Sequence, residues 1–450
     1  MQLTTRTLGE ICDEVGGTIR TGPFGSQLHE SDYVRDGTPV VMPKNIIDGK
    51  VSVEDIAFIG EIDVARLSQH KLHKGDIVYG RRGDIGRRAL ITEEEEGWIC
   101  GTGCLRISLG NTVLVPKFLY YYLGQPDVIA WIFNQAIGAT MPNLNTSIIR
   151  SISISYPPHP TQYKIAAILS AYNDLIENNT RRIAILEEMA QALYREWFVH
   201  FRFPGHEKKR MVESALGMIP EGWEVVKLGK VAIINSSSIK KGYEPFEINY
   251  VDINAVSTGS IENIEPILFS LAPGRARRIV KHGDIIWSTV RPNRRSYSII
   301  LNPFPNLIVS TGFAVISAYR VPYTYLYQAL TTDEFVSYLT NHATGSAYPA
   351  VNSGDFRDAL ILLPPESMLN EFHSIIANHF GQKQILHQKN INLHRTRDLL
   401  LPKLISGQVD VEGLNIETGE VMNEAAASIE EDVKKSAEAA LAGEQRTLWG

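Results

Sequence analysis

Arginine side chains gather at two places in the sequence, and both places flank a Gly-Asp dipeptide. The guanidinium group binds phosphates and the edge of guanine, so these groups are candidates for contacts with nucleic acid. A solvated charge run is the alternative for either group alone. Because the same neighbourhood is basic twice, we favour contacts with phosphates or base edges. The groups are Arg81, Arg82, Arg87 and Arg88 after residues 75–76, and Arg275, Arg277, Arg278, Arg291, Arg294 and Arg295 around residues 283–284.

Amide, hydroxyl and lysine side chains near these arginines complete the set of candidates for binding DNA. Asparagine and glutamine suit adenine as arginine suits guanine, and the sequence leaves open which side chains contact bases and which contact phosphates. In the first half of the chain the candidates are Lys44, Asn45, Arg81, Arg82 and Arg87. In the second half they are Lys240, Lys241, Arg291, Asn293 and Arg294. Secondary candidates in loops are Ser26, Thr140, Ser346 and Tyr348.

The sequence lacks the motifs of a catalytic or cofactor site. An adenine methyltransferase would need an Asn/Asp-Pro-Pro-aromatic loop, whereas residues 302–305 (NPFP) have these letters in the wrong order and are typical of a turn. No Gly-rich strand–helix junction that could hold S-adenosylmethionine is present, and neither is a GxxxxGK[ST] phosphate loop. Cys100 and Cys104 have no second Cys or His pair at a spacing that would suit a metal. We therefore expect no catalytic residue, no cofactor and no metal.

The elements that position these residues occur twice, because the chain is an internal duplication. Four short segments recur in the same order at offsets of 207 to 209 residues. They are residues 75–79 with 283–287, 102–103 with 311–312, 138–142 with 345–349, and 157–158 with 364–365. Each copy is a globular unit followed by a long helix.

Residues 161–200 and 367–407 carry apolar side chains at steps of three and four, which predicts two long amphipathic helices. The first would be roughly 60 Å long, too long to wrap around one small core. The two helices therefore most economically pack against each other as an antiparallel pair, with the globular units at opposite ends. Thr161 can cap the first helix, and Pro402 should kink or end the second.

Short apolar runs between glycine-containing turns predict strands at residues 77–79, 89–91, 105–107, 251–253, 284–287 and 313–316. Residues 116–136 predict a helix that is interrupted near Pro126. The loop at residues 21–26 (TGPFGS) is too rich in glycine for the interior of a strand. It is either a tight turn or a backbone surface that approaches phosphates.

The overall charge does not exclude a DNA-binding function. The net charge of the 450 residues is −6, but residues 410–450 contain ten acidic and three basic side chains, a net of −7. The preceding residues therefore sum to about +1 (−6 minus −7). No apolar run is long enough for a membrane span, and the N-terminal sequence is not a signal peptide. With Cys12, Cys100 and Cys104 read as reduced thiols, we expect a cytoplasmic protein.

Several phrases of the sequence resemble the DNA specificity subunits of Type I restriction-modification systems. They are residues 21–26 (TGPFGS), residues 217–229 (GMIPEGWEVVKLG), the long helix after the Pro-Pro pair, and residues 399–409 (LLLPKLISGQV). The resemblance covers residues 1 to about 410 and includes the order of these phrases. The tail after residue 410 resembles nothing that we can place.

This resemblance implies a function in which the chain recognises double-stranded DNA without catalysing a reaction. Each globular unit would be a target recognition domain that reads one half of a bipartite DNA site. The long helices would separate the two halves and provide the docking surface for two methyltransferase (modification) subunits. Restriction (helicase-nuclease) subunits would join the full complex. Because the loops of the two units differ, the half-sites should differ as well.

The expected fold is α+β, with two tandem α/β recognition domains separated by a pair of long antiparallel coiled-coil helices and related by a pseudo-two-fold axis. Residues 1–155 form the first domain and residues 156–203 the first spacer helix. Residues 204–361 form the linker and the second domain, and residues 362–407 the second spacer helix. Residues 408–450 form an acidic tail, either marginally helical or disordered.

Other interpretations of the same residues stay open. A free-standing DNA-binding scaffold or repressor would share every feature except the docking role of the helices. A standalone modification enzyme with a diverged cofactor site is a third, less favoured interpretation. At the level of side chains, the arginines could instead pair with local acids such as Asp84 or Asp284 and only hold loops together.

Overall fold

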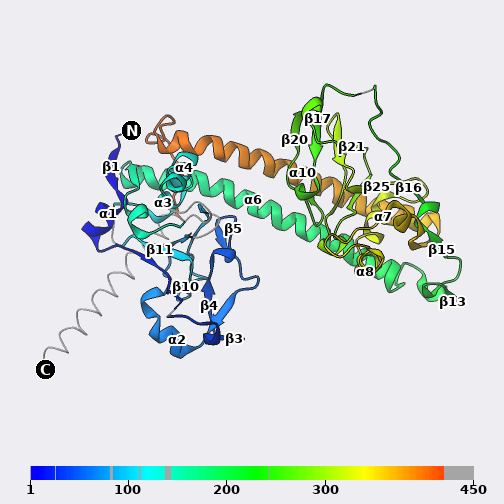
Figure 1. Ribbon diagram of the computed structural model, residues 1–450, viewed down its shortest axis with the longest axis horizontal. Coiled ribbons are helices and arrows are strands. Elements are labelled where there is room, and N and C mark those ends of the chain that lie inside the picture. Colours follow the sequence, from blue (N-terminus) through cyan, green and yellow to red (C-terminus); the bar gives the residue numbers. More distant parts are fainter. Residues whose placement is uncertain are drawn as a thin grey trace. The chain divides into compact units, whose positions relative to one another are not determined.

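The structure of the chain is a computed structural model that describes residues 2–25, 27–81, 85–110, 113–136, 143–242 and 244–419. It divides into two compact units, which are described separately (Figure 1). Unit 1 contains Met1–Ile176 and Ile391–Gly450, and unit 2 contains Glu177–Asn390. Of the acidic tail, residues 420–450 lie outside the described residues. No described helix is apolar over a length that could cross a membrane.

Unit 1 is built on two four-stranded sheets. The first has the order β2-β11-β8-β9, formed by Thr18–Thr21, Cys104–Ser108, Ile77–Gly80 and Arg88–Leu90. The second has the order β10-β4-β7-β3, formed by Ile99–Cys100, Thr38–Val41, Ala57–Ile59 and Tyr33–Val34. All four residues of β8 are buried, which explains its continuous apolar sequence. The three strands predicted for this half of the chain are confirmed to within one residue at either end.

Helices and two-stranded ribbons surround these sheets. The predicted interruption at Pro126 is confirmed, because α3 (Pro116–Tyr122) ends before α4 (Pro126–Gln135) begins. Proline is tolerated there as the first residue of a helix, where its missing N–H would have no partner. The other elements of unit 1 are α1 (Leu8–Val15), α2 (Glu61–Arg66), α5 (Thr146–Arg150), β1 (Thr4–Thr7) with β12 (Ser153–Tyr156), and β5 (Ile46–Ile47) with β6 (Lys50–Val51).

Unit 2 repeats the first sheet and the core of the second. Its first sheet is β16-β25-β22-β23, formed by Ala232–Ile234, Phe313–Ala318, Ile285–Ser288 and Tyr297–Ile299. Its second sheet is β20-β17-β24-β21, formed by Glu265–Leu268, Glu247–Val251, Leu307–Ser310 and Ala276–Ile279. In both units the second sheet contains one parallel pair, β4 with β10 and β17 with β24. The duplication predicted from the sequence is therefore a duplication of fold.

The remaining elements of unit 2 are α7 (Tyr323–Ala329), α8 (Asp333–His342), α9 (Ser353–Asp358), and three ribbons. The ribbons are β13 (Met211–Ser214) with β14 (Gly217–Pro220), β15 (Glu224–Lys227) with β26 (Leu360–Leu363), and β18 (Val256–Ser257) with β19 (Ser260–Ile261). The strand predicted at residues 251–253 is wrong after Val251. There the Asp252 side chain accepts a hydrogen bond from the Asn254 N–H and starts a 3-10 turn.

The repeated Gly-Asp dipeptide has the same structural role in both units. Asp76 accepts hydrogen bonds from the Ser108 hydroxyl (2.5 Å) and the His73 N–H (2.9 Å). Asp284 accepts them from the Ser317 hydroxyl (2.6 Å) and the Lys281 N–H (2.9 Å). Both carboxyl groups are buried, and burial raises the pKa of each. Each aspartate thus ties the turn before a central strand to the neighbouring strand.

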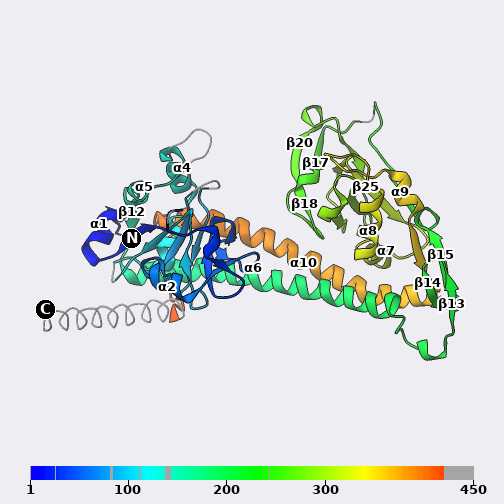
Figure 2. The same ribbon diagram turned by 60° about the horizontal axis from the view of Figure 1, so that its bottom comes forward.

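Each unit is completed by segments of two long helices, α6 (His159–Tyr194) and α10 (Glu366–Ile405). In unit 1, Asn173 on α6 is bound by Arg397 on α10 (2.8 Å). In unit 2, Asn179 donates to Asn390 (2.9 Å), and Lys383 forms an ion pair with Glu187. Residue numbers rise along one helix as they fall along the other, so the predicted antiparallel pairing is confirmed within each unit (Figure 2).

The ends of the helices differ from two predictions. Thr161 is not the cap of α6, because the helix already begins at His159 and the Thr161 N–H bonds to the Pro158 carbonyl. The helix α10 continues to Ile405, so the alternative that it ends at Pro402 is wrong, whereas the alternative of a kink there stays a prediction. Proline removes one N–H donor and is costly in a helix interior, but here it lies in the last turn of the helix. The Pro402 carbonyl still accepts a hydrogen bond from the Ser406 N–H (3.0 Å).

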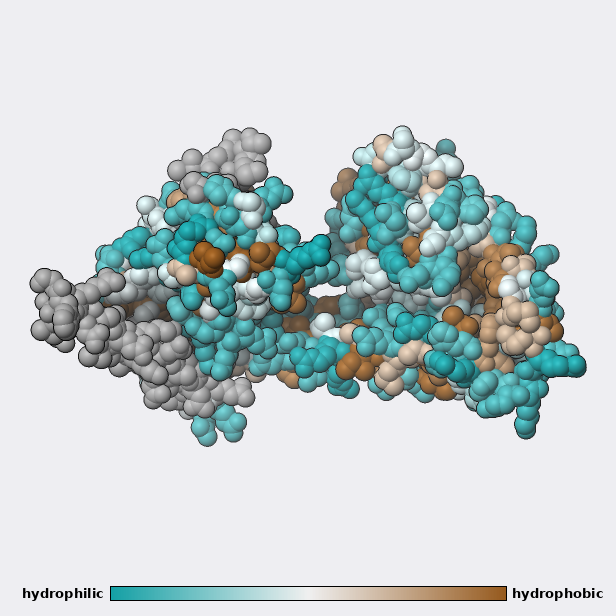
Figure 3. Space-filling model, turned by 90° about the horizontal axis from the view of Figure 1, so that it is seen from below, coloured by the Kyte–Doolittle hydropathy of each residue, from teal (hydrophilic) through white to brown (hydrophobic). Residues whose placement is uncertain are grey.

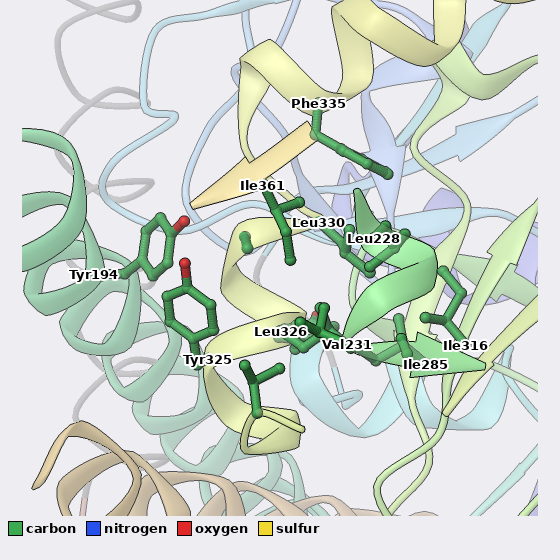
Figure 4. Close-up of a cluster of buried hydrophobic side chains, with 14 of the residues drawn as sticks. Tyr194, Leu228, Val231, Ile285, Ile316, Tyr325, Leu326, Leu330, Phe335 and Ile361 are labelled. Carbon is green, nitrogen blue, oxygen red and sulfur yellow. The ribbon is translucent and has the colours of Figure 1, made fainter. Parts of the chain in front are cut away.

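Aromatic side chains join the end of α6 to the core of unit 2. Tyr194 lies on α6 and faces Tyr325 on α7, with ring centroids 5.7 Å apart (Figure 4). After Tyr194 the helix widens into a π-helical turn, Arg195–Val199, which places Trp197 and Phe198 in the same cluster. Phe198 packs against Phe372 of α10 at 5.0 Å. This cluster fixes both helices to the sheet of unit 2.

Candidate nucleic-acid interface

The loop that follows β22 in unit 2 has a strained backbone. Arg291 and Arg295 have φ values of +50° and +54°, in the left-handed region that residues other than glycine rarely adopt. Between them, Pro292–Arg294 forms a single 3-10 turn. Such strain persists only where the surrounding structure holds it, and it is common at functional sites. The turn leaves Asn293 and Arg294 exposed at the tip of the loop.

A second loop packs against the first through Arg291. The Arg291 N–H donates to the Pro349 carbonyl (2.7 Å), and its guanidinium donates to the Ala347 carbonyl (3.1 Å). The guanidinium also lies 4.7 Å from the centre of the Tyr348 ring. Tyr348 itself is 69% exposed. Arg291 therefore supports the loop that carries Ser346 and Tyr348, and all of these residues belong to one surface of unit 2.

Some of the other arginines of this cluster form ion pairs with aspartates, and among the described residues Arg294 does not. Arg295 forms an ion pair with Asp333, and Arg275 forms one with Asp252 (2.7 Å). The alternative that arginines hold local structure is therefore correct for these two, although neither partner is Asp284. Asp84 lies outside the described residues. Within the described part of the chain, the Arg294 side chain has no ion pair or hydrogen bond. Arg294 is thus the arginine of this loop that is available for a ligand.

In unit 1 the structure changes the interpretation of Arg81. Its side chain is only 9% exposed, its Nε donates to the Leu144 carbonyl (3.1 Å), and its guanidinium lies 5.9 Å from the Phe24 ring. The Arg81 carbonyl also accepts the Leu144 N–H (2.9 Å). Arg81 ties two loops together, so we remove it from the residues expected to contact DNA.

Backbone hydrogen bonds show which residues of the two units correspond. The Arg81 N–H donates to the Gly103 carbonyl, as the Thr289 N–H does to the Gly312 carbonyl. Arg81 is therefore the counterpart of Thr289 rather than of Arg291. The two units use the same loops but place different side chains on them.

Asn45 is also removed from the candidate set. It is 1% exposed, its Oδ1 accepts the Met42 N–H (3.1 Å), and its Nδ2 donates to the Glu54 carbonyl (3.2 Å). These bonds stabilise the turn before β5, so its amide is not available to a base. The neighbouring Lys44 is exposed, and so is Arg87, which immediately precedes β9.

The other predicted contact residues are exposed in loops or lie outside the described residues. Lys240, Lys241 and Ser346 are exposed in loops of unit 2. Ser26, Arg82 and Thr140 lie outside the described residues. Sequence reasoning missed Phe24, whose ring is 57% exposed on the TGPFGS loop. The loop itself was recognised from its glycines, but nothing in that pattern indicates which way its one aromatic side chain points.

Two further observations bear on cofactors. All three cysteines are free thiols in the core of unit 1. Among the described residues, no group of three His, Cys, Asp or Glu side chains is arranged to hold a metal ion.

Comparison with known proteins finds relatives that share one description. Residues 4–188 match the family model described as the Type I restriction modification DNA specificity domain. The MjaIX specificity subunit of Methanocaldococcus jannaschii is 28% identical over 362 residues, which cover 79% of this chain and 82% of that protein. Over most of its length, the chain is therefore similar to Type I restriction-modification specificity subunits. The HindI specificity subunit of Haemophilus influenzae is 21% identical over 413 residues, covering 77% of this chain and 89% of that protein.

The fold of the specificity subunits agrees with that of this chain. A crystal structure of a Type I restriction-modification S subunit from M. genitalium matches with a TM-score of 0.53 and 17% identity. The match covers 90% of this chain and 96% of that one. The predicted α+β architecture with two sheet-rich units and long helices is therefore confirmed.

Proposed function

We propose that the chain is the sequence-specific DNA-binding subunit of a Type I restriction-modification complex, and that each unit reads one half of a bipartite site in double-stranded DNA. The observation that carries this proposal is the duplication of one fold with different side chains on corresponding loops. In unit 2 the loop after β22 presents the exposed Asn293 and Arg294, and at the position of its Thr289 the corresponding loop after β8 in unit 1 carries the buried Arg81. Two readers of one fold with different loops should recognise two different half-sites.

The residues that we propose for DNA contacts are the exposed ones. Arginine and asparagine can read guanine and adenine in the major groove, and lysine adds contacts to phosphates. Arg291 supports the second loop and is a positioning residue. The set is Lys44 and Arg87 in unit 1, and Lys240, Lys241, Asn293, Arg294, Ser346 and Tyr348 in unit 2.

We propose that α6 and α10 fix the spacing between the half-sites, because each helix contributes residues to both units. The two helices also expose apolar side chains, visible as brown patches along them in Figure 3. In unit 1 these are Leu175, Ile391 and Leu399, and in unit 2 they are Ile185, Met189, Ile375 and Ile385, all between 38% and 58% exposed. Such patches are typical of surfaces that a protein partner covers.

Two methyltransferase subunits are the partners that we propose for these patches, one for each copy of the repeat. Restriction subunits would join that complex, and cytoplasmic DNA would be the substrate on which it acts. Recognition rather than catalysis is the function that the named relatives support. The same relatives support this function over a free-standing scaffold or repressor, which would leave the apolar patches uncovered.

Selection of DNA from a random duplex library tests the proposed function. The chain would be purified together with modification subunits, and the bound duplexes would be sequenced. We expect a motif of two defined parts separated by an undefined spacer of constant length. Recovery of one continuous motif, or of no motif, would contradict the proposed function.

A further inference from the structure

The turn between β18 and β19 in unit 2 contacts the long helices directly. The ammonium group of Lys383 on α10 donates to the Gly259 carbonyl in this turn (2.9 Å). The same ammonium group forms the ion pair with Glu187 on α6. The Lys383 side chain is only 15% exposed, so both interactions are largely shielded from water and salt. Lys383 therefore joins three elements, α6, α10 and the turn.

Glycine allows this turn to lie close to α6. The φ of Gly259 is +78°, in the left-handed region that favours glycine. A Cβ atom at this position would lie 3.2 Å from a carboxylate oxygen of Glu187 and 3.3 Å from the Tyr327 hydroxyl. The turn is therefore packed against the helix, and its position depends on the helix.

The same turn holds the end of the loop that follows β22. The Thr258 hydroxyl donates to the Arg295 carbonyl (3.1 Å), and the Gly259 N–H donates to the Tyr297 carbonyl (2.8 Å). Arg295 directly follows the 3-10 turn of that loop. Arg294, which is proposed to contact DNA, is thus the neighbour of a residue whose carbonyl the turn holds.

The helix α10 also holds the segment after β23, the strand into which this loop leads. Gln384, the neighbour of Lys383, donates to the Leu301 carbonyl (2.6 Å). Its Oε1 accepts a hydrogen bond from the Asn302 side chain (2.8 Å). Two consecutive residues of α10 therefore fix the end of the loop, one through the turn and the other through β23.

Unit 1 has the same turn without the lysine. The turn at Gly49 between β5 and β6 is the counterpart, because each hairpin follows a 3-10 turn after a strand of the second sheet. The Gly49 carbonyl accepts a hydrogen bond from the Tyr120 hydroxyl (3.4 Å). At the repeat offset of 207 residues, the position of Lys383 corresponds to Ile176. Because isoleucine has neither a charge nor a donor, it cannot hold the turn of unit 1 in this way.

We propose that Lys383 is a positioning residue for DNA recognition by unit 2. Through Thr258 and Gly259 it fixes the direction in which the loop after β22 presents Asn293 and Arg294. Hydrogen bonds to the edge of a base depend on direction, so a loop that reads bases must be held in one geometry. This inference rests on the proposed function and adds to it a physical link between the paired helices and the reader of unit 2.

Selection of duplexes from a random library, with the chain purified together with modification subunits, tests this role. Lys383→Met keeps a long unbranched side chain and removes the donor to Gly259. We expect the selected motif to relax only in the half that Arg294→Ala also alters. The preference there should fall about tenfold, the size of one lost hydrogen bond from a charged donor. Lys383→Arg, which keeps a charged donor, should retain the preference.

A second variant tests the path through the turn. Thr258→Val keeps the shape of the side chain and removes the hydroxyl that donates to the Arg295 carbonyl. It should relax the same half of the motif as Lys383→Met. The double variant should be no less selective than the weaker single variant, because both changes interrupt one series of contacts. Fully additive losses would contradict a path through Thr258.

Lys389→Met is the matched control, since Lys389 is an exposed lysine further along α10. It should select the wild-type motif. The proposal is overturned if Lys383→Met selects the wild-type motif, or if it loses affinity evenly for all DNAs together with a lowered melting temperature. Either result, with a bipartite motif selected by the wild type, would refute the positioning role alone. If the wild type selects no bipartite motif, the proposed function fails as well.

Discussion

Arg294 and Arg295 are neighbours in the sequence, but only one of them is held by the fold. Arg295 is paired with Asp333, whereas the Arg294 side chain has no such partner within the described residues. The sequence does not distinguish the two residues, because they are of the same type and adjacent. What separates them is tertiary structure, because Asp333 at the start of α8 pairs with Arg295.

Arg294→Ala should therefore weaken DNA binding without loss of stability. If Arg294 reads a guanine, the loss should be about 1–3 kcal/mol and should relax the sequence at one position of one half-site. If it contacts a phosphate, binding should weaken evenly across sequences and the salt dependence should flatten. Equilibrium binding to DNAs altered in one half-site, at several salt concentrations, separates these results.

Arg295→Ala is the matched control for this measurement. Loss of its ion pair with Asp333 should lower the melting temperature, and any effect on DNA should be spread over all sequences. A sequence-specific loss of DNA affinity in Arg295→Ala with none in Arg294→Ala would contradict this assignment. It would mean that Arg295 contacts DNA and that Arg294 does not.

Asp284 gives the stability of unit 2 a defined pH dependence. Burial raises its pKa above that of an aspartate in the unfolded chain, about 3.9. The folded chain therefore binds this proton at a higher pH than the unfolded chain does. At neutral pH the buried, ionised carboxylate of Asp284 lowers the free energy of unfolding. This loss of stability disappears as the pH falls through the pKa of Asp284 in the folded chain. The stability of the wild type relative to Asp284→Asn should therefore rise between about pH 7 and about pH 4. Urea unfolding at each pH measures it, and a relative stability that falls instead would be inconsistent with a raised pKa.

At the scale of elements, hydrophobic periodicity predicts the helices and strands whose formation depends mainly on the burial of an apolar face. The long helices and the strands at residues 77–79, 105–107 and 313–316 follow from it, because their faces are buried. The ends of elements depend on single hydrogen bonds that periodicity does not report. Asp252 ends β17 with its own side chain, and Pro402 is tolerated because few residues of the helix follow it. The same limit applies to Asn45, whose burial follows from a turn that the sequence did not indicate.

The exposed apolar faces of the helices can be tested one residue at a time. Ile385→Glu and Leu399→Glu should reduce the affinity for modification subunits, because a carboxylate in a covered apolar surface loses its hydration. Both side chains are more than half exposed, at 58% and 57%, so the fold and the binding of DNA by the free chain should not change. Surface plasmon resonance with immobilised modification subunits measures the affinity.

Ile62→Glu is the control, since Ile62 is 85% exposed but lies on the short helix α2. It should bind modification subunits as the wild type does. Unchanged affinity in both helix variants would exclude these two positions from the docking surface.

At the scale of the whole molecule, the pairing of α6 with α10 determines how the spacing hypothesis must be tested. Asn179 is hydrogen-bonded to Asn390, so an insertion in one helix alone would shift the pairing. Four residues added to both helices, after Asn179 and before Asn390, should keep the pair in register and lengthen each helix by roughly 6 Å. The spacer between half-sites should then grow while the half-site sequences stay the same.

Mapping of methylated sites in cells that carry the lengthened chain measures the spacer. The insertion in α6 alone should lower the melting temperature and serves as a control for the pairing. An unchanged spacer with full activity would be evidence against the helices as the element that sets the distance.

The independence of the two readers is the central claim, and one pair of variants tests it most directly. Lys44→Ala with Arg87→Ala changes exposed residues of unit 1, and Asn293→Ala with Arg294→Ala changes exposed residues of unit 2. Each double variant, purified with modification subunits, would be used to select duplexes from the same random library. Two separate readers predict that each variant alters only its own half of the selected motif, with the other half and the spacer unchanged. Loss of both halves together in either variant would contradict the account.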